Sequence, residues 1–170
     1  MIGCQAFDSP YRALVASVWS GATVHYTGAF WFPIRVDDFW QLIEDFDRYQ
    51  EWWPWLEAFT ADQDGLIAGN VLRATILPPV PLRLRIQVRF QSCQRLTLTE
   101  ASITGDLRGH ASLAFDEQLG GTRVRADWTL EPASKPVRVA TRVARPLVAW
   151  GHDRVVAMAV TGIGGKDVRL

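Results

Sequence analysis

The sequence predicts a single domain of the α+β class, with most strands and helices in separate stretches of the chain. Short segments between residues 57 and 131 alternate apolar and polar residues with the period of two expected of strands. An apolar stripe with helical spacing follows at residues 134–164. At 170 residues the chain is long enough to bury one core without a second domain. Such an order is typical of an antiparallel sheet covered by helices on one face.

The first residues are expected to add a short helix to this domain. Ser9 and Pro10 provide a cap and a first-turn proline, apolar residues follow at helical spacing as far as Trp19, and Gly21 ends the pattern. We therefore predict that residues 1–22 form an N-terminal extension, and that residues 23–165 form the main domain.

One strand and two short helices come next. Residues 23–32 alternate as a strand does, and Gly28 within them suggests a bulge or a bend. Residues 36–46 place their large apolar side chains on one helical face, and residues 47–53 form a second helix that stops before Pro54.

Six further strands bring the predicted sheet to about seven. They are expected at residues 57–62, 70–77, 82–90, 96–104, 107–115 and 123–131, and Gly120-Gly121 is a hairpin signal. The inferred inward face carries almost no polar atom. It consists of Leu84, Ile86, Val88, Leu113, Phe115, Val124, Ala126, Trp128 and Leu130.

The closing helix, residues 134–164, begins at Ser134 and ends at Gly164-Gly165. Pro146 is expected to kink it or to split it in two. Its apolar stripe alternates large residues with Ala and Gly, including Gly151. A helix with such a face either presses closely on the sheet or leaves room for a molecule that is not protein.

Composition excludes several functions. Eighteen basic and eighteen acidic residues give a formal charge of zero, so no overall field attracts nucleic acid. The two cysteines, Cys4 and Cys93, form no metal-binding motif, and we expect neither a metal nor a cofactor. No basic leader and no apolar run of about 18 residues is present, which predicts a cytoplasmic protein.

The element order and several motifs resemble the START-like superfamily, and within it the polyketide cyclase/dehydrase and lipid-transport family. The motifs are residues 39–49, FWQLIEDFDRY, running into Trp52-Trp53-Pro54; the GTRV hairpin exit at 121–124; and the segment from Arg145 to Asp153. The resemblance covers about residues 23–165. It implies a helix-grip fold, in which a curved sheet wraps a long C-terminal helix over a cavity for a lipid, polyketide or other hydrophobic molecule.

Eight tryptophans also favour a cavity over a filled core, because each buried indole N–H needs a hydrogen-bond partner. Opposite Ala and Gly on the last helix, they suit a pocket of roughly several hundred Å³. The expected ligand-binding residues are Tyr26, Phe30, Trp40, Trp53, Leu84, Ile86, Val88, Trp128, Leu147, Trp150 and Gly151.

Catalytic groups are sparse, so binding is favoured over catalysis. The weak candidates are Tyr26, Tyr49, Asp106 and His152. Adjacent helical residues point about 100° apart, so His152 and Asp153 are not expected to form a dyad. A polyketide cyclase or aromatase remains an alternative, and it requires at least two of the four candidates in one cavity.

Two questions about partners stay open. One helical face carries four basic residues, Lys135, Arg138, Arg142 and Arg145. These side chains either stay solvated or pair with the six acids between Asp37 and Glu51. The third alternative is that they contact a membrane surface or an acyl carrier transiently. The chain is expected to be a monomer or a homodimer. The second alternative is a partner-binding domain with a filled interior that dimerises through an apolar surface at residues 155–160.

Overall fold

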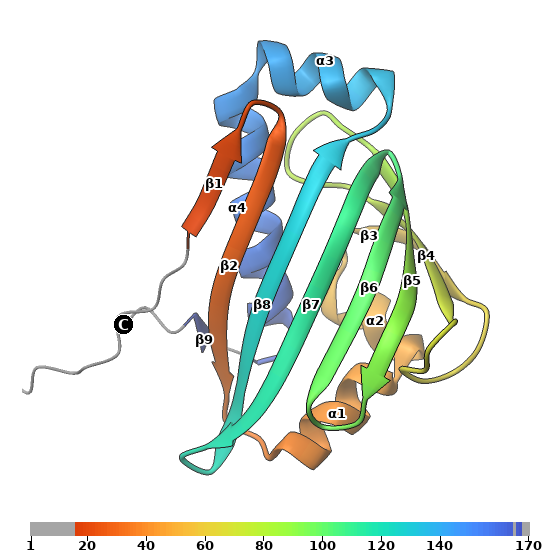
Figure 1. Ribbon diagram of the computed structural model, residues 1–170, viewed down its shortest axis with the longest axis vertical. Helices are drawn as coiled ribbons and strands as arrows, with labels where there is room; N and C mark the ends of the chain where they lie inside the picture. Colours follow the sequence, from red (N-terminus) through yellow and green to blue (C-terminus); the bar gives the residue numbers. More distant parts are fainter. Residues whose placement is uncertain (1–15, 165, 168–170) are drawn as a thin grey trace, which may run out of the picture.

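One antiparallel sheet organises the structure, a computed structural model that describes residues 16–164 and 166–167 (Figure 1). Within these residues the sheet has nine strands in the order β1-β2-β8-β7-β6-β5-β4-β3, and β9 pairs with β2. The strands are β1 Ala16–Ser20, β2 Thr23–Phe32, β3 Leu56–Ala61, β4 Val71–Ile76, β5 Leu84–Gln94, β6 Leu98–Gly105, β7 Leu107–Gln118, β8 Gly121–Pro132 and β9 Lys166–Asp167. The prediction of an α+β domain with a long C-terminal helix is confirmed, with more strands than the seven expected.

The strand β1 corrects the N-terminal prediction. Residues Ala16–Ser20 pair with β2, where Trp19 lies opposite Val24, so the predicted helix does not extend through them. Its earlier part lies outside the described residues. The division of the chain at residue 22 stays a prediction.

The long strands β2 and β8 pair with each other, and both alternate buried and exposed residues. In β8, Val124 and Ala126 are buried whereas Arg125 and Asp127 are exposed. The pairing of β2 with β8 continues through Gly28 opposite Ala126, so Gly28 marks no bulge. A Cβ at Gly28 would lie 2.5 Å from the Tyr26 hydroxyl, and the glycine therefore leaves room for the Tyr26 ring.

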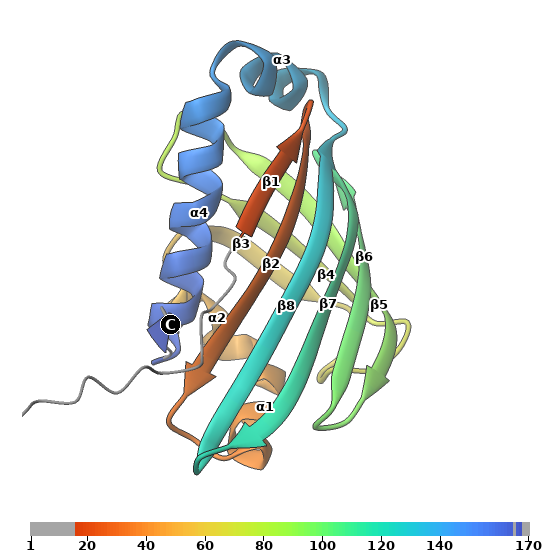
Figure 2. The ribbon, with the colours of Figure 1, turned by 60° about the vertical axis from the view of Figure 1, so that its left-hand side comes forward.

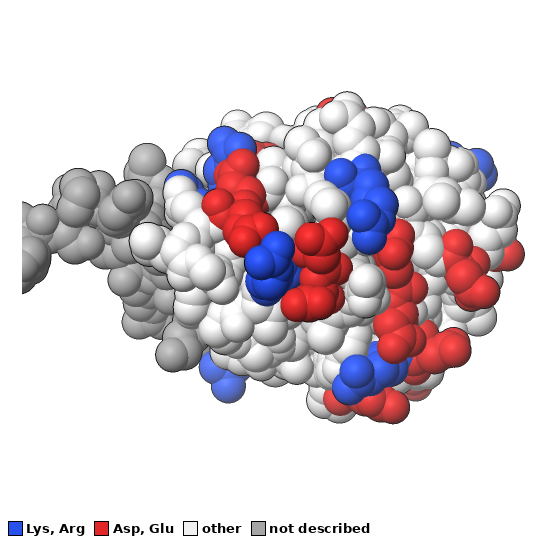
Figure 3. Space-filling view, turned by 90° about the horizontal axis from the view of Figure 1, so that it is seen from below, with Lys and Arg blue, Asp and Glu red and all other residues white. Residues whose placement is uncertain are grey.

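Short helices close one end of the sheet. The helix α1 spans Val36–Glu44, the 3₁₀ turn η1 spans Phe46–Arg48 and α2 spans Tyr49–Trp52. Phe39 of α1 packs between Phe32 and Phe115, with ring centroids 4.5 and 5.9 Å away. Acidic side chains gather on the outer surface of this end, with a few basic ones between them (Figure 3).

The closing helix is split, as Pro146 predicts. The helix α3 spans Lys135–Val143, Ala144 leaves helical geometry with φ −128° and ψ 39°, and α4 spans Arg145–Gly162. The helix α3 lies across one end of the sheet, and α4 runs along its concave side (Figures 1 and 2). No helix among the described residues is both long enough and apolar enough to cross a bilayer.

Candidate ligand-binding site

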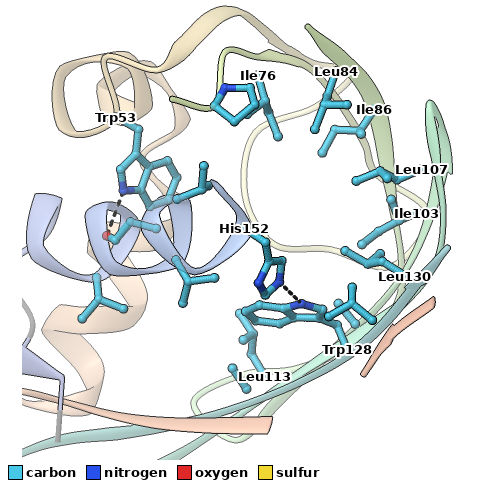
Figure 4. A pocket seen from close by; sticks show the side chains of 18 of the residues that line it. Trp53, Ile76, Leu84, Ile86, Ile103, Leu107, Leu113, Trp128, Leu130 and His152 are labelled. Carbon is cyan, nitrogen blue, oxygen red and sulfur yellow. Dashed lines mark hydrogen bonds between the residues drawn. The ribbon is translucent and has the colours of Figure 1, made fainter. Parts of the chain in front are cut away.

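A cavity of about 470 Å³ lies between the concave face of the sheet and α4 (Figure 4). Its wall is almost wholly apolar and takes residues from every strand from β1 to β8 except β3, and from α1, α2, α3 and α4. Protein cores leave few voids larger than a water molecule, because empty space forfeits dispersion contacts. A void of this size is therefore a feature of the fold, within the range of small-molecule sites.

The sheet side of the wall follows the predicted inward face. Eight of the nine predicted residues line the cavity, namely Leu84, Ile86, Leu113, Phe115, Val124, Ala126, Trp128 and Leu130. Val88 lies on the same face of β5 but packs against the buried core and is absent from the wall. Figure 4 shows Leu84, Ile86, Leu107 and Leu130 arranged along the curve of the sheet.

The helix side of the wall is formed by one face of α4, Val148, Gly151, His152, Val155, Val156 and Ala159. A Cβ at Gly151 would lie 2.9 Å from Val80 Cγ1, so this glycine lets the loop at residues 77–83 approach the helix. Val155, Val156, Ala159 and Val160 line the cavity, which leaves Ala157 and Met158 of the apolar outer surface that one alternative required. The filled interior which that alternative expected is also absent.

The two ends of the cavity differ in exposure. At the α1 end the lining residues, among them Phe32, Phe39 and Phe115, are buried. At the α3 end the wall combines Val137 and Thr141 of α3 with turn and loop residues, and one of these, Ala22, is exposed to solvent.

The structure places the predicted ligand-binding residues in two groups. Phe30, Trp53, Leu84, Ile86, Trp128 and Gly151 lie on the wall, whereas Tyr26, Trp40, Val88, Leu147 and Trp150 do not. Trp40 is buried under α1, where its Nε1 donates to Glu44 Oε1 at 2.7 Å. Leu147 and Trp150 are 44% and 52% exposed, because the break at Ala144 turns the inner face of α4 away from them.

Tyr26 lies behind the wall. Its ring stacks on that of Trp128, with centroids 4.1 Å apart and an interplanar angle of 12°. Tyr26 is absent from the wall, and it contacts the two wall residues Trp128 and His152 instead.

A chain of hydrogen bonds crosses from the sheet to α4 at His152. Trp128 Nε1 donates to His152 Nε2 at 3.1 Å (Figure 4). On the other side of the ring, His152 Nδ1 lies 2.9 Å from Asp153 Oδ1. Ser17 Oγ on β1 donates to the same carboxylate oxygen at 2.8 Å. The expectation that His152 and Asp153 point too far apart to form a dyad is therefore wrong, because the short Asp153 side chain turns back to the imidazole.

The other catalytic candidates have structural partners. Tyr49 lines the buried end of the cavity, but its hydroxyl donates to the Ile43 carbonyl at 2.5 Å. Burial raises the pKa of Tyr49, and the carboxylates of Glu44 and Asp45 raise it further. Asp106 is not on the wall. Its Oδ2 accepts from the Arg85 N–H at 2.7 Å, and its carbonyl accepts from the N–H groups of Ala133 and Ser134.

Sequence reasoning missed Ser17, Trp19 and Asp153. Trp19 lines the cavity and lies edge-on to His152, with ring centroids 6.3 Å apart. The Ser20-Gly21 pair between two apolar stretches was the available turn signal, and it was interpreted as a helix end. In the described part of the chain no cluster of three His, Cys, Asp or Glu side chains could hold a metal ion.

Comparisons with known proteins identify the fold. No protein-family model matches the chain, and no curated protein sequence matches it. Protein TTHA0849 from Thermus thermophilus is 16% identical, with a TM-score of 0.65 over 82% of this chain and 93% of that one. Protein Ms6760 from Mycobacterium smegmatis is 18% identical, with a TM-score of 0.62 over 88% and 92%.

A third similar structure is an enzyme solved with small molecules. It is norcoclaurine synthase from Thalictrum flavum in complex with dopamine and hydroxybenzaldehyde, which is 15% identical with a TM-score of 0.54 over 81% of this chain and 83% of that one. At such identities the likeness concerns architecture alone. A curved antiparallel sheet wrapped on a long C-terminal helix gives this chain a helix-grip fold, the architecture that it shares with these solved structures.

Proposed function

We propose that this protein binds a hydrophobic small molecule in the cavity under α4 and carries it. The observation that supports the proposal is the apolar cavity of about 470 Å³, which joins the buried core at one end and exposed turns at the other. Transfer of apolar surface from water into such a site contributes about 25 cal/mol per Å². Lipids, polyketides and aromatic compounds are the classes that fit.

Binding is preferred over catalysis because the wall offers few reactive groups. Two of the four candidates, Tyr49 and His152, line the cavity, but the Tyr49 hydroxyl is already bonded to a backbone carbonyl. An acid–base reaction generally needs titratable groups within hydrogen-bond reach of the substrate. A cyclase therefore remains the second candidate function. Its acid–base chemistry would depend on His152 alone among the four candidate residues.

The test is a fluorescence titration with pyrene, an apolar probe, on two matched variants of β7. Ala111 lines the cavity, whereas Ala114 lies on the opposite face of the same strand. Ala111→Phe is expected to weaken pyrene binding by at least about tenfold, because the new ring occupies the void. Ala114→Phe should bind as the native protein does. Native protein that binds no pyrene, or equal binding by both variants, would exclude the cavity as the site.

Loading is proposed to occur at an anionic lipid surface through α3. Arg138, Arg142 and Arg145 are exposed, and with Lys135 they form no salt bridge within the described residues. Exposed apolar side chains lie among them, Val139, Val143, Leu147 and Trp150. Basic and apolar side chains together are typical of helices that lie in a bilayer interface. The acidic surface at α1 lies at the opposite end of the molecule, so it cannot pair with the basic side chains near α3 (Figures 1 and 3). This separation of charge favours an orientation of the protein with α3 toward an anionic membrane and α1 away from it.

Vesicle sedimentation tests this route. The double variant Arg138→Glu/Arg142→Glu should lose binding to vesicles of phosphatidylserine and phosphatidylcholine, and the same reversal at Arg85 and Arg89 on the exposed face of β5 should not. Equal binding by both variants would contradict a lipid-facing α3. Monomeric or dimeric state and cytoplasmic location stay predictions.

A further inference from the structure

We propose that the ligand carries a hydroxyl group and inserts it between Trp128 Nε1 and His152 Nε2. This inference rests on the proposed function and names the polar chemistry that the cavity selects. In the structure these two nitrogens are bonded directly to each other at 3.1 Å, on the wall of an otherwise apolar void.

The hydrogen-bond partners fix which nitrogen of His152 carries the proton. An indole N–H only donates, so His152 Nε2 must be the unprotonated nitrogen. Nδ1 then carries the proton and donates to Asp153 Oδ1 at 2.9 Å. The imidazole therefore presents an acceptor to the cavity side, next to the donor of Trp128.

Both members of the pair are held by contacts outside the cavity. Trp128 is fixed by stacking on Tyr26, and Tyr26 also lies edge-on to His152 at 5.5 Å. Asp153, which orients the imidazole, accepts a second hydrogen bond from Ser17 Oγ. A ligand group thus meets a donor and an acceptor that are already oriented, which lowers the entropy cost of binding.

A hydroxyl is the small group that satisfies both positions at once. Its oxygen accepts from the indole N–H and its hydrogen is donated to the imidazole nitrogen. An ether or ketone oxygen accepts only, so insertion of either would leave the half-buried Nε2 without a donor, at a cost in affinity. A pure hydrocarbon leaves the Trp128–His152 bond in place and gains nothing from it.

Three of the remaining polar side chains of the wall are already bonded to the backbone, and Trp19 can only donate. Tyr49, Trp53 and Thr141 donate to the backbone carbonyls of Ile43, Ala159 and Val137. Trp19 Nε1 is buried and has no hydrogen-bond partner in the described part of the chain. Thr99 adds one hydroxyl, which lies at the buried end. The ligand class is therefore an apolar body, aromatic or acyl, with one alcohol, phenol or enol beside His152.

The experiment compares three probes that share one apolar body: pyrene, 1-methoxypyrene and 1-hydroxypyrene. Fluorescence titration of the native protein should give a dissociation constant for 1-hydroxypyrene about tenfold lower than that for 1-methoxypyrene, the size expected for a net hydrogen bond to a desolvated acceptor. In His152→Phe the ratio of the two constants should fall close to one. His110→Phe, the same change on the exposed face of β7, should keep the native ratio.

A second measurement covers the case in which His152→Phe does not fold. The ¹⁵N resonance of His152 Nε2 in the native protein should shift when 1-hydroxypyrene is added and stay in place with pyrene. An equal affinity for all three probes, or a native ratio in His152→Phe, would overturn the inference and leave the carrier proposal intact. Failure of pyrene itself to bind would reject the carrier proposal, and this inference with it.

Discussion

Trp128 on β8 and His152 on α4 are joined by a hydrogen bond of 3.1 Å between their ring nitrogens. The bond spans the two layers that enclose the cavity and is the polar link between their side chains on its wall (Figure 4). It also sets the protonation of the imidazole, because the indole can only donate. Three predictions do not require a ligand, and one of them tests this pair.

The first prediction concerns the tautomer of His152. The proton of the imidazole is expected on Nδ1, because Trp128 donates to Nε2 and Asp153 lies within hydrogen-bond distance of Nδ1. Long-range ¹H–¹⁵N correlation spectra of labelled protein distinguish the two tautomers directly. The exposed His110 serves as the internal reference for an unconstrained imidazole. A proton found on Nε2 would contradict the hydrogen-bond chain described above.

The second prediction concerns stability at alkaline pH. The pKa of Tyr49 is raised by burial first and by Glu44 and Asp45 second, so the folded state keeps a proton that the unfolded state loses above about pH 10. The contribution of Tyr49 is therefore fully present below pH 10 and falls by about 1.4 kcal/mol per pH unit above it. Tyr49→Phe should cost about 1 kcal/mol at pH 7, because the Ile43 carbonyl loses its donor.

Urea unfolding of native and Tyr49→Phe protein between pH 7 and 11 measures this effect. The difference in unfolding free energy between the two proteins should shrink above pH 10 and then change sign. A difference that stays constant over the whole range would show that Tyr49 ionises equally in both states.

The third prediction concerns the hairpin between β7 and β8. Leu119 and Gly120 form its two-residue loop, both with positive φ, 52° and 73°, and the Leu119 side chain is 90% exposed. Asn adopts this conformation more readily than Leu, so Leu119→Asn should raise the unfolding free energy by roughly 0.5–1 kcal/mol. Leu96 is the control, since it also has positive φ, at 64°, but packs against the core, and Leu96→Asn should destabilise. Thermal or urea unfolding that ranks the two variants the other way would refute this reasoning.

Alternation in sequence was sufficient to predict the sheet side of the cavity. In β8 the residues from Val124 to Leu130 alternate strictly between apolar and polar, so only one face of the strand can point to the interior. All four apolar residues of this segment line the wall. Alternation cannot say where the packed core ends and the cavity begins. For this reason Val88 was predicted on the wall, although it packs against the buried core.

Helical periodicity was less informative about which side of a helix meets the cavity. The predicted stripe continued in phase through Ala144, whereas the chain leaves helical geometry there and restarts at Arg145. Val148, Val155 and Ala159 of that stripe do line the cavity. His152 and Val156 join them, whereas Leu147 of the stripe is exposed. Pro146 predicts a break but not the angle between the two helices.

Contacts that local patterns do not reveal explain two wrong predictions, the helix at residues 16–20 and the cavity position of Trp40. Residues Ala16–Ser20 become a strand because β2 offers them an edge, and a capping signal at Ser9 carries no information about that edge. Trp40 satisfied the aromatic pattern of a cavity residue, yet it is fixed under α1 by Glu44 of the same helix. Such choices depend on partners far apart in the sequence.

Native mass spectrometry of the full chain, before and after extraction with organic solvent and with pyrene added back, tests the ligand-holding cavity most directly. One small molecule per chain is expected, either co-purified or taken up as pyrene, with retention by Ala114→Phe and loss in Ala111→Phe. Spectra that contain only the bare polypeptide under every condition would contradict this expectation.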